Sequence, residues 1–145
     1  MTPPDRASDP PAPRKSILVV EDDSTIRALM TRVLSRHGFD VREVADGRRA
    51  IDVARSSAFD LVITDLVMPE LEGLETIRVL RRECPSLDIL AVSGAYGGAF
   101  LHAAELLGAR ATLAKPFDTD ALVDAVQRII ESQSDVGRAS VTSDR

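Results

Sequence analysis

Five short apolar runs alternate with segments of helical periodicity along most of this chain, and that alternation limits its fold more than any other feature. Three of the runs are nearly continuous Ile, Leu and Val, as expected for parallel strands that are covered on both faces. The other two are more mixed, which suits strands at the edges of a sheet. Strands and helices that alternate with short links predict an α/β fold with a parallel sheet, right-handed crossovers and helices on both faces. The runs occupy residues 17–20, 41–44, 61–64, 87–92 and 109–114, and the mixed ones are 41–44 and 109–114.

The helical segments between these runs have recognisable ends. Asp23 or Ser24 can cap the first helix, and Gly38 follows its last apolar residue. Pro85 must end the third helix, because the residue before a proline is disfavoured in the helical region. Gly108 closes the fourth segment in the same way as Gly38 closes the first. The pattern therefore predicts five helices, each following one strand.

The ends of the chain lack this pattern. Five of the first 13 residues are proline, so residues 1–15 are expected to form a disordered N-terminal tail. Residues 132–145 are polar, small and without periodicity, and a flexible C-terminal tail is expected there. A single domain then covers residues 16–131 of the 145-residue chain.

Charge and composition exclude several kinds of function. The net charge is −5 with a pI near 5.0, and no basic stripe is present, so no nucleic-acid partner is expected. No apolar run reaches the roughly 18 residues that span a bilayer, and residues 1–15 lack the apolar stretch of a signal peptide, so a cytoplasmic protein without a membrane partner is expected. The one cysteine, Cys84, predicts a buried or half-buried apolar contact rather than a disulfide or metal cluster.

Polar residues with complementary chemistry follow four of the five predicted strands. In a parallel sheet the ligand site lies beyond the carboxyl ends of the strands. Carboxylates that meet there repel one another unless a cation lies between them, and oxygen ligands suit Mg²⁺. A carboxylate beside Mg²⁺ can attack phosphorus to give an acyl phosphate, while a lysine and a serine bind the phosphoryl oxygens. The residues are Glu21, Asp22 and Asp23 after the first strand, Asp65 after the third, Ser93 after the fourth and Lys115 after the fifth.

Each of these residues also has a structural explanation. Residues 21–23 could serve only as the acidic start of a helix. Asp65 could form a turn before Pro69, Ser93 could simply end a strand, and Lys115 with Pro116 could be a turn. Their joint occurrence at successive strand ends favours phosphoryl-transfer chemistry over these separate explanations.

The motifs at residues 17–24, 64–69 with Gly73, 92–94 and 114–117 resemble those of receiver domains of bacterial two-component response regulators. The resemblance covers residues 16 to about 131 and implies a flavodoxin-like doubly wound fold with five parallel strands in the order 2-1-3-4-5. It also implies roles for individual residues, with Asp23 capping the helix rather than binding metal. Asp65 is the implied phosphoacceptor, Glu21, Asp22, Asp65 and the main-chain carbonyl of Val67 are the implied Mg²⁺ ligands, and Ser93 and Lys115 are the implied contacts to the phosphoryl oxygens.

The function that this resemblance implies is that of a phosphoacceptor switch. A sensor histidine kinase or a histidine phosphotransfer protein would supply the phosphoryl group. The chain would not act as an enzyme beyond autocatalysing its own phosphorylation and slow dephosphorylation. A downstream protein would read the change on the surface formed by residues 99–107, 110–112 and part of 118–130, and homodimer formation stays open.

Two features depart from the usual receiver pattern. Receivers usually carry Tyr or Phe three residues before the lysine, and Thr112 occupies that position here. The loop at residues 94–98 contains three glycines, whose backbone freedom would let it move on phosphorylation. We therefore expect this loop to carry the change that the aromatic ring usually reports. Tyr96 could take over part of the role of that ring, but a surface tyrosine without such a role is favoured. A change restricted to the helix after Asp65 is the alternative.

Other functions fit the same residues less well. An aspartyl-phosphate phosphatase usually has a second Asp two residues after the nucleophile, where this chain has Val67. A flavin or nucleotide carrier needs a phosphate-binding loop after the first strand, and the acidic residues 21–23 would repel phosphate. A transcription factor needs a second domain of about 60 residues or more. The remaining alternative is a phosphorylation-independent interaction module with a receiver fold.

Overall fold

The computed structural model describes residues 13–66, 72–94 and 99–143, with only the backbone described for residue 72 and for residues 134–143. Five strands and five helices alternate along these described residues, and the strands form one parallel sheet in the order β2-β1-β3-β4-β5. The predicted α/β fold, strand order and helix number are thereby confirmed. The elements are β1 (Ser16–Val20), α2 (Ser24–Arg36), β2 (Asp40–Val44), α3 (Gly47–Ser56), β3 (Leu61–Asp65), α4 (Glu72–Glu83), β4 (Asp88–Ser93), α5 (Ala99–Leu106), β5 (Ala111–Ala114) and α6 (Thr119–Ser143).

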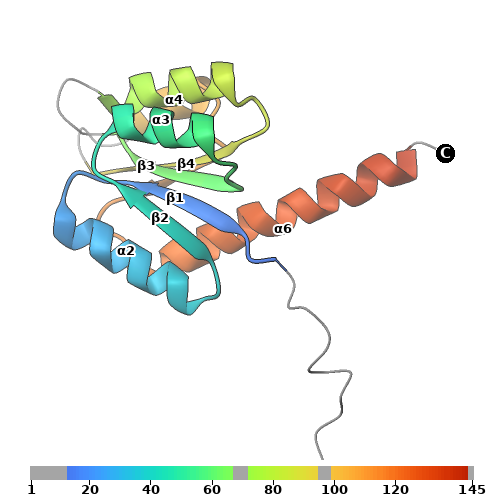
Figure 1. Cartoon of the computed structure of the whole chain (residues 1–145), viewed down its shortest axis with the longest axis horizontal. Coiled ribbons are helices and arrows are strands. Elements are labelled where there is room, and N and C mark those ends of the chain that lie inside the picture. The colour runs from blue at the N-terminus through green and yellow to red at the C-terminus, as the bar shows by residue number, and fades with distance from the viewer. Residues whose placement is uncertain (1–12, 67–71, 95–98, 144–145) are drawn as a thin grey trace, which may run out of the picture.

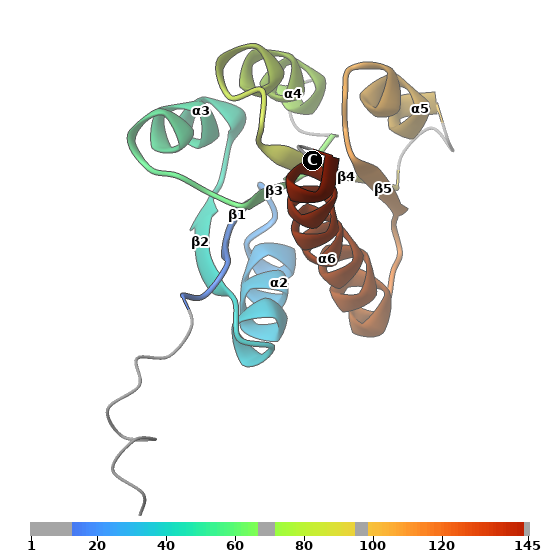
Figure 2. The ribbon, with the colours of Figure 1, turned by 90° about the vertical axis from the view of Figure 1, so that its right-hand side faces the viewer.

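The helices form two layers around this sheet. Figure 2 shows α2 and α6 on one face and α3, α4 and α5 on the other. Alternate side chains of β1 face the two helix layers. Leu18 and Val20 pack toward α3–α5, and Ile17 and Val19 pack toward α2 and α6. Both sets of side chains are fully buried, which explains why the strand is a continuous apolar run.

The two strands with mixed composition lie at the edges of the sheet, as predicted. Residues of β2 are exposed or half-buried along the whole strand, and the same is true of β5. Cys84 is half-buried and packs against the cluster beneath α3–α5. These positions match the expectations from sequence.

Local signals define most helix ends. The Asp23 carboxylate accepts hydrogen bonds from the main-chain N–H groups of Thr25 (2.9 Å) and Ile26 (3.0 Å), so Asp23 is the N-cap of α2. Gly38 and Gly108 have φ values of 90° and 108° after α2 and α5, a backbone conformation that suits glycine. Helix α4 ends at Glu83, two residues before Pro85.

Helix α6 is longer than the sequence pattern indicated. We expected residues 132–145 to form a flexible tail, but α6 continues to Ser143 and extends beyond the sheet in Figure 1. The Gln133 side chain contributes to this continuation, since its Nε2 donates to the Asp60 carbonyl and to the Asp88 carboxylate, each at 2.8 Å. Arg110 also donates to the Ser132 hydroxyl. Polar bonds of this kind leave no apolar periodicity from which a helix could be predicted.

At the other end, the expected disordered segment falls mostly on residues 1–12, which lie outside the described residues. Residues 13–15 precede β1 without regular structure. Within the part of the chain that the structure describes, no helix combines the length and the apolar character needed to cross a membrane.

Candidate functional site

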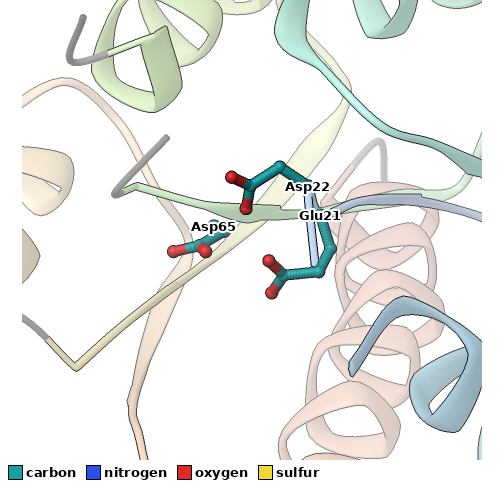
Figure 3. Close-up of side chains that lie close together, drawn as sticks. All are labelled: Glu21, Asp22 and Asp65. Carbon is teal, nitrogen blue, oxygen red and sulfur yellow. The ribbon is translucent and has the colours of Figure 1, made fainter. Parts of the chain in front are cut away.

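Three acidic side chains that are distant in sequence meet at the carboxyl edge of the sheet. Glu21 and Asp22 directly follow β1, and Asp65 is the last residue of the neighbouring strand β3. One carboxylate oxygen from each residue lies within 4.8 Å of the other two. Figure 3 shows the three carboxyl groups gathered around the ends of these strands. Glu21 and Asp65 are buried, at 1% and 6% exposure, and Asp22 faces solvent.

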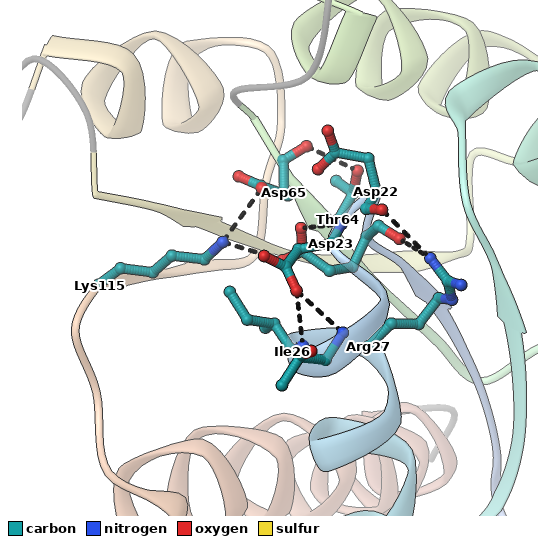
Figure 4. Close-up of polar contacts among 9 residues, drawn as sticks. Asp22, Asp23, Ile26, Arg27, Thr64, Asp65 and Lys115 are labelled. Atoms are coloured by element: carbon teal, nitrogen blue, oxygen red, sulfur yellow. Dashed lines mark hydrogen bonds and ion pairs between the residues drawn. The ribbon is translucent and has the colours of Figure 1, made fainter.

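Lys115 reaches this group from the end of the edge strand β5. It directly follows β5, and its Nζ lies 2.9 Å from Glu21 Oε1 and 3.1 Å from Asp65 Oδ2. The Lys115 side chain is 21% exposed, and Figure 4 shows it extended from its loop toward Asp65. In this state the ammonium group provides the positive charge that the two buried carboxylates share.

Burial shifts the ionisation of this cluster. It raises the pKa of the Glu21 carboxyl group from the usual 4.5 to about 7, with the Lys115 hydrogen bond opposing the shift and the negative charge of Asp65 adding to it. Burial acts to lower the pKa of Lys115, but hydrogen bonds to Glu21 and Asp65 outweigh it and raise that pKa. Lys115 therefore stays charged, while Glu21 holds a proton readily unless a further cation comes close.

Backbone hydrogen bonds beyond the strands hold these side chains in place. The Leu66 N–H donates to the Val92 carbonyl, and the Lys115 N–H donates to the Ser93 carbonyl, each at 2.9 Å. The Asp23 N–H donates to Glu21 Oε2 at 3.2 Å. The sheet ladder thus continues into the loops that carry the site, which limits their freedom to move.

Ser93 occupies the position that the sequence predicted, at the end of its strand. Ser93 is the last residue of β4, is wholly buried, and lies on the strand between those that carry Asp65 and Lys115. Val67, Pro69, Tyr96 and most of the glycine-rich loop lie outside the described residues. Thr112 is half-buried on β5, opposite Ala91 in the strand register.

Two glycines allow the backbone to approach the site closely. A Cβ on Gly73 would collide with the Asp65 carbonyl and the Leu66 Cα, so α4 can start against this loop only with glycine there. A Cβ on Gly94 would lie 2.8 Å from the Lys115 Cβ. The role of Gly94 in loop movement stays a prediction, and the structure adds a second reason for glycine there, which is room for the lysine.

Sequence reasoning missed Arg27. This residue of α2 donates from Nη1 to the Glu21 carbonyl at 2.7 Å, directly behind the acidic residues. Its position one turn into the helix was the only available signal, and an arginine there is usually exposed. The contact depends on how the loop and α2 pack together, which the local sequence pattern does not specify.

The donor set fits a hard divalent cation. Carboxylate oxygens from three residues converge at one exposed edge, and two of them are buried together with a single ammonium group. Oxygen ligands with room for water are typical of Mg²⁺ sites. The residues also include a carboxylate, Asp65, that can act as a nucleophile.

Comparisons with known proteins agree with this geometry. The family model of the response regulator receiver domain matches residues 17–127. Sporulation initiation phosphotransferase F of Bacillus subtilis is 30% identical over 121 residues, which cover 83% of this chain and 97% of that protein. The structure of the chemotaxis response regulator CheY4 of Vibrio cholerae superposes with a TM-score of 0.75 at 28% identity, covering 81% of this chain and 99% of that one.

Some relatives are longer. The alkaline phosphatase synthesis transcriptional regulatory protein SphR of Synechococcus elongatus is 38% identical over 125 residues, covering 79% of this chain and 49% of that protein. The chain therefore spans about half the length of that relative. The segment that the family model matches carries the acidic cluster and the lysine, and the chain belongs to the response regulator receiver domain family of two-component signalling.

Proposed function

We propose that this chain accepts a phosphoryl group on Asp65 and uses it to switch a protein-binding surface. The observation that carries the proposal is the position of the Asp65 carboxylate, which ends β3 with Lys115 Nζ 3.1 Å away and with Glu21 and Asp22 beside it. A nucleophilic oxygen, a positive charge for phosphoryl oxygens and a cation-binding pair are thus within reach of one another.

In the transfer step an Asp65 carboxylate oxygen attacks the phosphorus of the donor. The new O–P bond forms as the bond from phosphorus to the donor breaks, and the electron pair of that bond leaves with the donor atom, a histidine nitrogen or an acetate oxygen. Glu21, Asp22, Asp65 and the carbonyl of Val67 would hold Mg²⁺, which offsets the negative charge of the phosphoryl oxygens when bound. Lys115 would exchange its carboxylate contacts for a phosphoryl oxygen, and the Ser93 hydroxyl would donate to another. Attack by water on phosphorus would later release inorganic phosphate and restore the carboxylate.

The proposed donor is a phosphohistidine, and the names of two relatives support a kinase or phosphotransfer protein as the partner. The relatives include a protein named a phosphotransferase, and sensor kinase CckA of Brucella abortus, which is 32% identical over 120 residues that make up 13% of its length. A donor histidine must reach Asp65 from the open edge of the sheet. A mainly apolar hollow of about 410 Å³ lies beside Lys115 at this edge, and Leu29, 47% exposed, is part of its rim. We propose that the donor protein contacts this hollow.

The output surface is proposed to comprise α5, β5 and part of α6. Thr112 replaces the usual aromatic residue on β5, and Ser93 precedes the glycine-rich loop at residues 94–98. A hydrogen bond from Ser93 to a phosphoryl oxygen would bias that loop between two arrangements. Hydrogen exchange with and without beryllofluoride tests this: unchanged protection from residue 94 through 107 would favour a change near α4 instead.

Intact-mass measurement after incubation with acetyl phosphate and Mg²⁺ tests the central proposal. The wild-type protein is expected to gain one phosphoryl group, about 80 Da, that hydroxylamine removes as it does from an acyl phosphate. Asp65→Asn, which keeps the shape of the side chain, should gain nothing. A label retained in that variant would reject Asp65 as the acceptor. An unlabelled wild type would favour the phosphorylation-independent interaction module.

A further inference from the structure

Arg27 reaches back from α2 to the main chain of the acidic loop. Its Nη1 donates to the Glu21 carbonyl at 2.7 Å and lies 3.4 Å from the Asp22 carbonyl. The side chain is 19% exposed, so most of it lies inside the protein. These two carbonyls belong to the residues whose carboxylates face Asp65, and the arginine therefore contacts the loop at its functional positions.

The guanidinium group is itself held by β2. Arg27 Nε lies 3.7 Å from Glu43 Oε1, and the Thr31 hydroxyl, one helical turn after Arg27, donates to Glu43 Oε2 at 2.5 Å. The neighbouring Val44 carbonyl accepts a hydrogen bond from the Glu21 N–H at 3.2 Å. The edge strand thus supports the loop twice, through its backbone and through a side-chain relay from Thr31 to Glu43 to Arg27.

This arrangement holds the acidic loop in place against the mutual repulsion of residues 21–23, which are three consecutive acidic residues. Unrestrained, like charges would turn the Glu21 and Asp22 side chains apart, and a cation would have to bring them together on binding. In Figure 4, Arg27 and Lys115 approach this loop from opposite sides. Lys115 contacts the carboxylates themselves, whereas Arg27 contacts the carbonyls and so leaves the carboxylate oxygens available to a metal ion.

We propose that Arg27 is a positioning residue, which holds the Glu21–Asp22 main chain so that both carboxylates face the metal position, with Glu43 and Thr31 fixing the guanidinium group. The inference rests on the proposed function, because it concerns Mg²⁺ binding at the same site. Groups behind the direct ligands commonly change metal affinity without touching the ion, by orienting those ligands.

Metal affinity measured without any reaction tests the proposal. Binding of Mn²⁺, a spectroscopic substitute for Mg²⁺, is followed by the electron paramagnetic resonance signal of the free ion, and Mg²⁺ is measured by competition. Arg27→Met keeps the length of the side chain and removes its charge and donors, and it should raise the Kd about tenfold. Arg27→Lys should recover part of the loss, because an ammonium group can bond a carbonyl but cannot also span to Glu43. Arg32→Met is the matched control, since Arg32 is an exposed arginine of the same helix and its loss removes the same charge.

The relay from Thr31 to Glu43 to Arg27 is tested with the variant Glu43→Gln, alone and combined with Arg27→Met. Alone, this change should weaken Mn²⁺ binding less than Arg27→Met does. Combined with Arg27→Met it should add almost nothing, because Glu43 acts through Arg27 and coupled residues are not additive. If Arg27→Met does not fold by circular dichroism, Arg27→Lys and Glu43→Gln decide the question.

Two failures are distinguishable. Wild-type Mn²⁺ affinity in folded Arg27→Met, with or without a lower melting temperature, would show that Arg27 only stabilises the fold and would overturn this inference alone. A wild-type protein that binds neither Mn²⁺ nor Mg²⁺ and takes no phosphoryl group from acetyl phosphate would overturn the proposed function and the inference with it.

Discussion

Replacing Lys115 with methionine would remove the one cation that contacts both buried carboxylates in the described structure. Lys115 Nζ lies 2.9 Å from Glu21 Oε1 and 3.1 Å from Asp65 Oδ2, and these acidic side chains are only 2% and 7% exposed. Methionine keeps an unbranched stem of similar length, so packing changes little. The variant therefore isolates the charge, and it leaves two buried carboxylates facing each other.

The size of the effect follows from burial. Removing one partner of a buried ion pair costs about 3–5 kcal/mol. The cost is reduced here because the site opens to solvent at Asp22, and because Glu21, with a pKa raised to about 7, can take up a proton. We expect the free energy of unfolding at neutral pH to fall by about 2–3 kcal/mol, which corresponds to a melting temperature lower by about 5–10 °C.

Magnesium should reverse much of this loss. In the wild type Mg²⁺ must compete with Lys115 for Glu21 and Asp65, whereas in the variant the two carboxylates no longer share a contact with the ammonium group. Binding to the folded state alone stabilises it by mass action, so millimolar MgCl₂ should raise the melting temperature of Lys115→Met more than that of the wild type.

Thermal and urea unfolding, followed by circular dichroism in EDTA and in MgCl₂, measure both effects. Lys15→Met is the control, because Lys15 is the only other lysine of the chain and pairs with Asp60 at 3.9 Å on the surface, with side chains 43% and 36% exposed. That pair should contribute about 0–1 kcal/mol. Equal losses in the two variants, or equal stabilisation of wild type and Lys115→Met by Mg²⁺, would refute the reasoning.

Three further predictions follow from the same site. The free energy of unfolding of the metal-free protein should decrease as pH rises from about 4.5 to about 7, because the folded state binds the Glu21 proton more tightly than the unfolded chain does; urea titrations of Glu21→Gln should be flatter over that range, and an identical slope would contradict the assignment. Gly73→Ala should cost about 1–3 kcal/mol and slow labelling by acetyl phosphate, since the added Cβ collides with the Asp65 carbonyl and Leu66 Cα; wild-type stability and rate would exclude that collision. Lys115→Ala should still become phosphorylated but lose the amide chemical-shift changes in α5 and α6 on beryllofluoride addition, and changes identical to those of the wild type would argue against a role for Lys115 in the response.

Most of the fold could be read from short-range patterns. A strand covered by helices on both faces is apolar along most of its length, and β1 and β3 are recognisable for that reason. The observed bounds differ from the predicted ones by one or two residues, as for β5, which begins at Ala111 rather than at residue 109. Helix α6 is the larger difference, because its continuation past residue 131 involves polar bonds such as that of Gln133 to Asp88, which leave no periodic signal.

The candidate site was predictable in its members because parallel strands present their carboxyl ends at one edge. Glu21, Asp22 and Asp65 meet there as expected, and Ser93 and Lys115 lie at the predicted strand ends. The roles of these residues in phosphoryl transfer, and the contribution of Val67, stay predictions.

The sequence by itself determined the class of fold, the strand ends that carry polar residues, and the members of the acidic cluster. Each of these depends on local periodicity or on a general rule of parallel sheets. Only the tertiary structure decided which charges pair. Lys115 and Glu21 are 94 positions apart, and Arg27 contacts both the main-chain carbonyl of Glu21 and the carboxylate of Glu43. Such contacts depend on how far a flexible side chain extends and on where packing of the whole core places its backbone. The distance between the two partners in the folded chain therefore cannot be predicted from a short stretch of sequence.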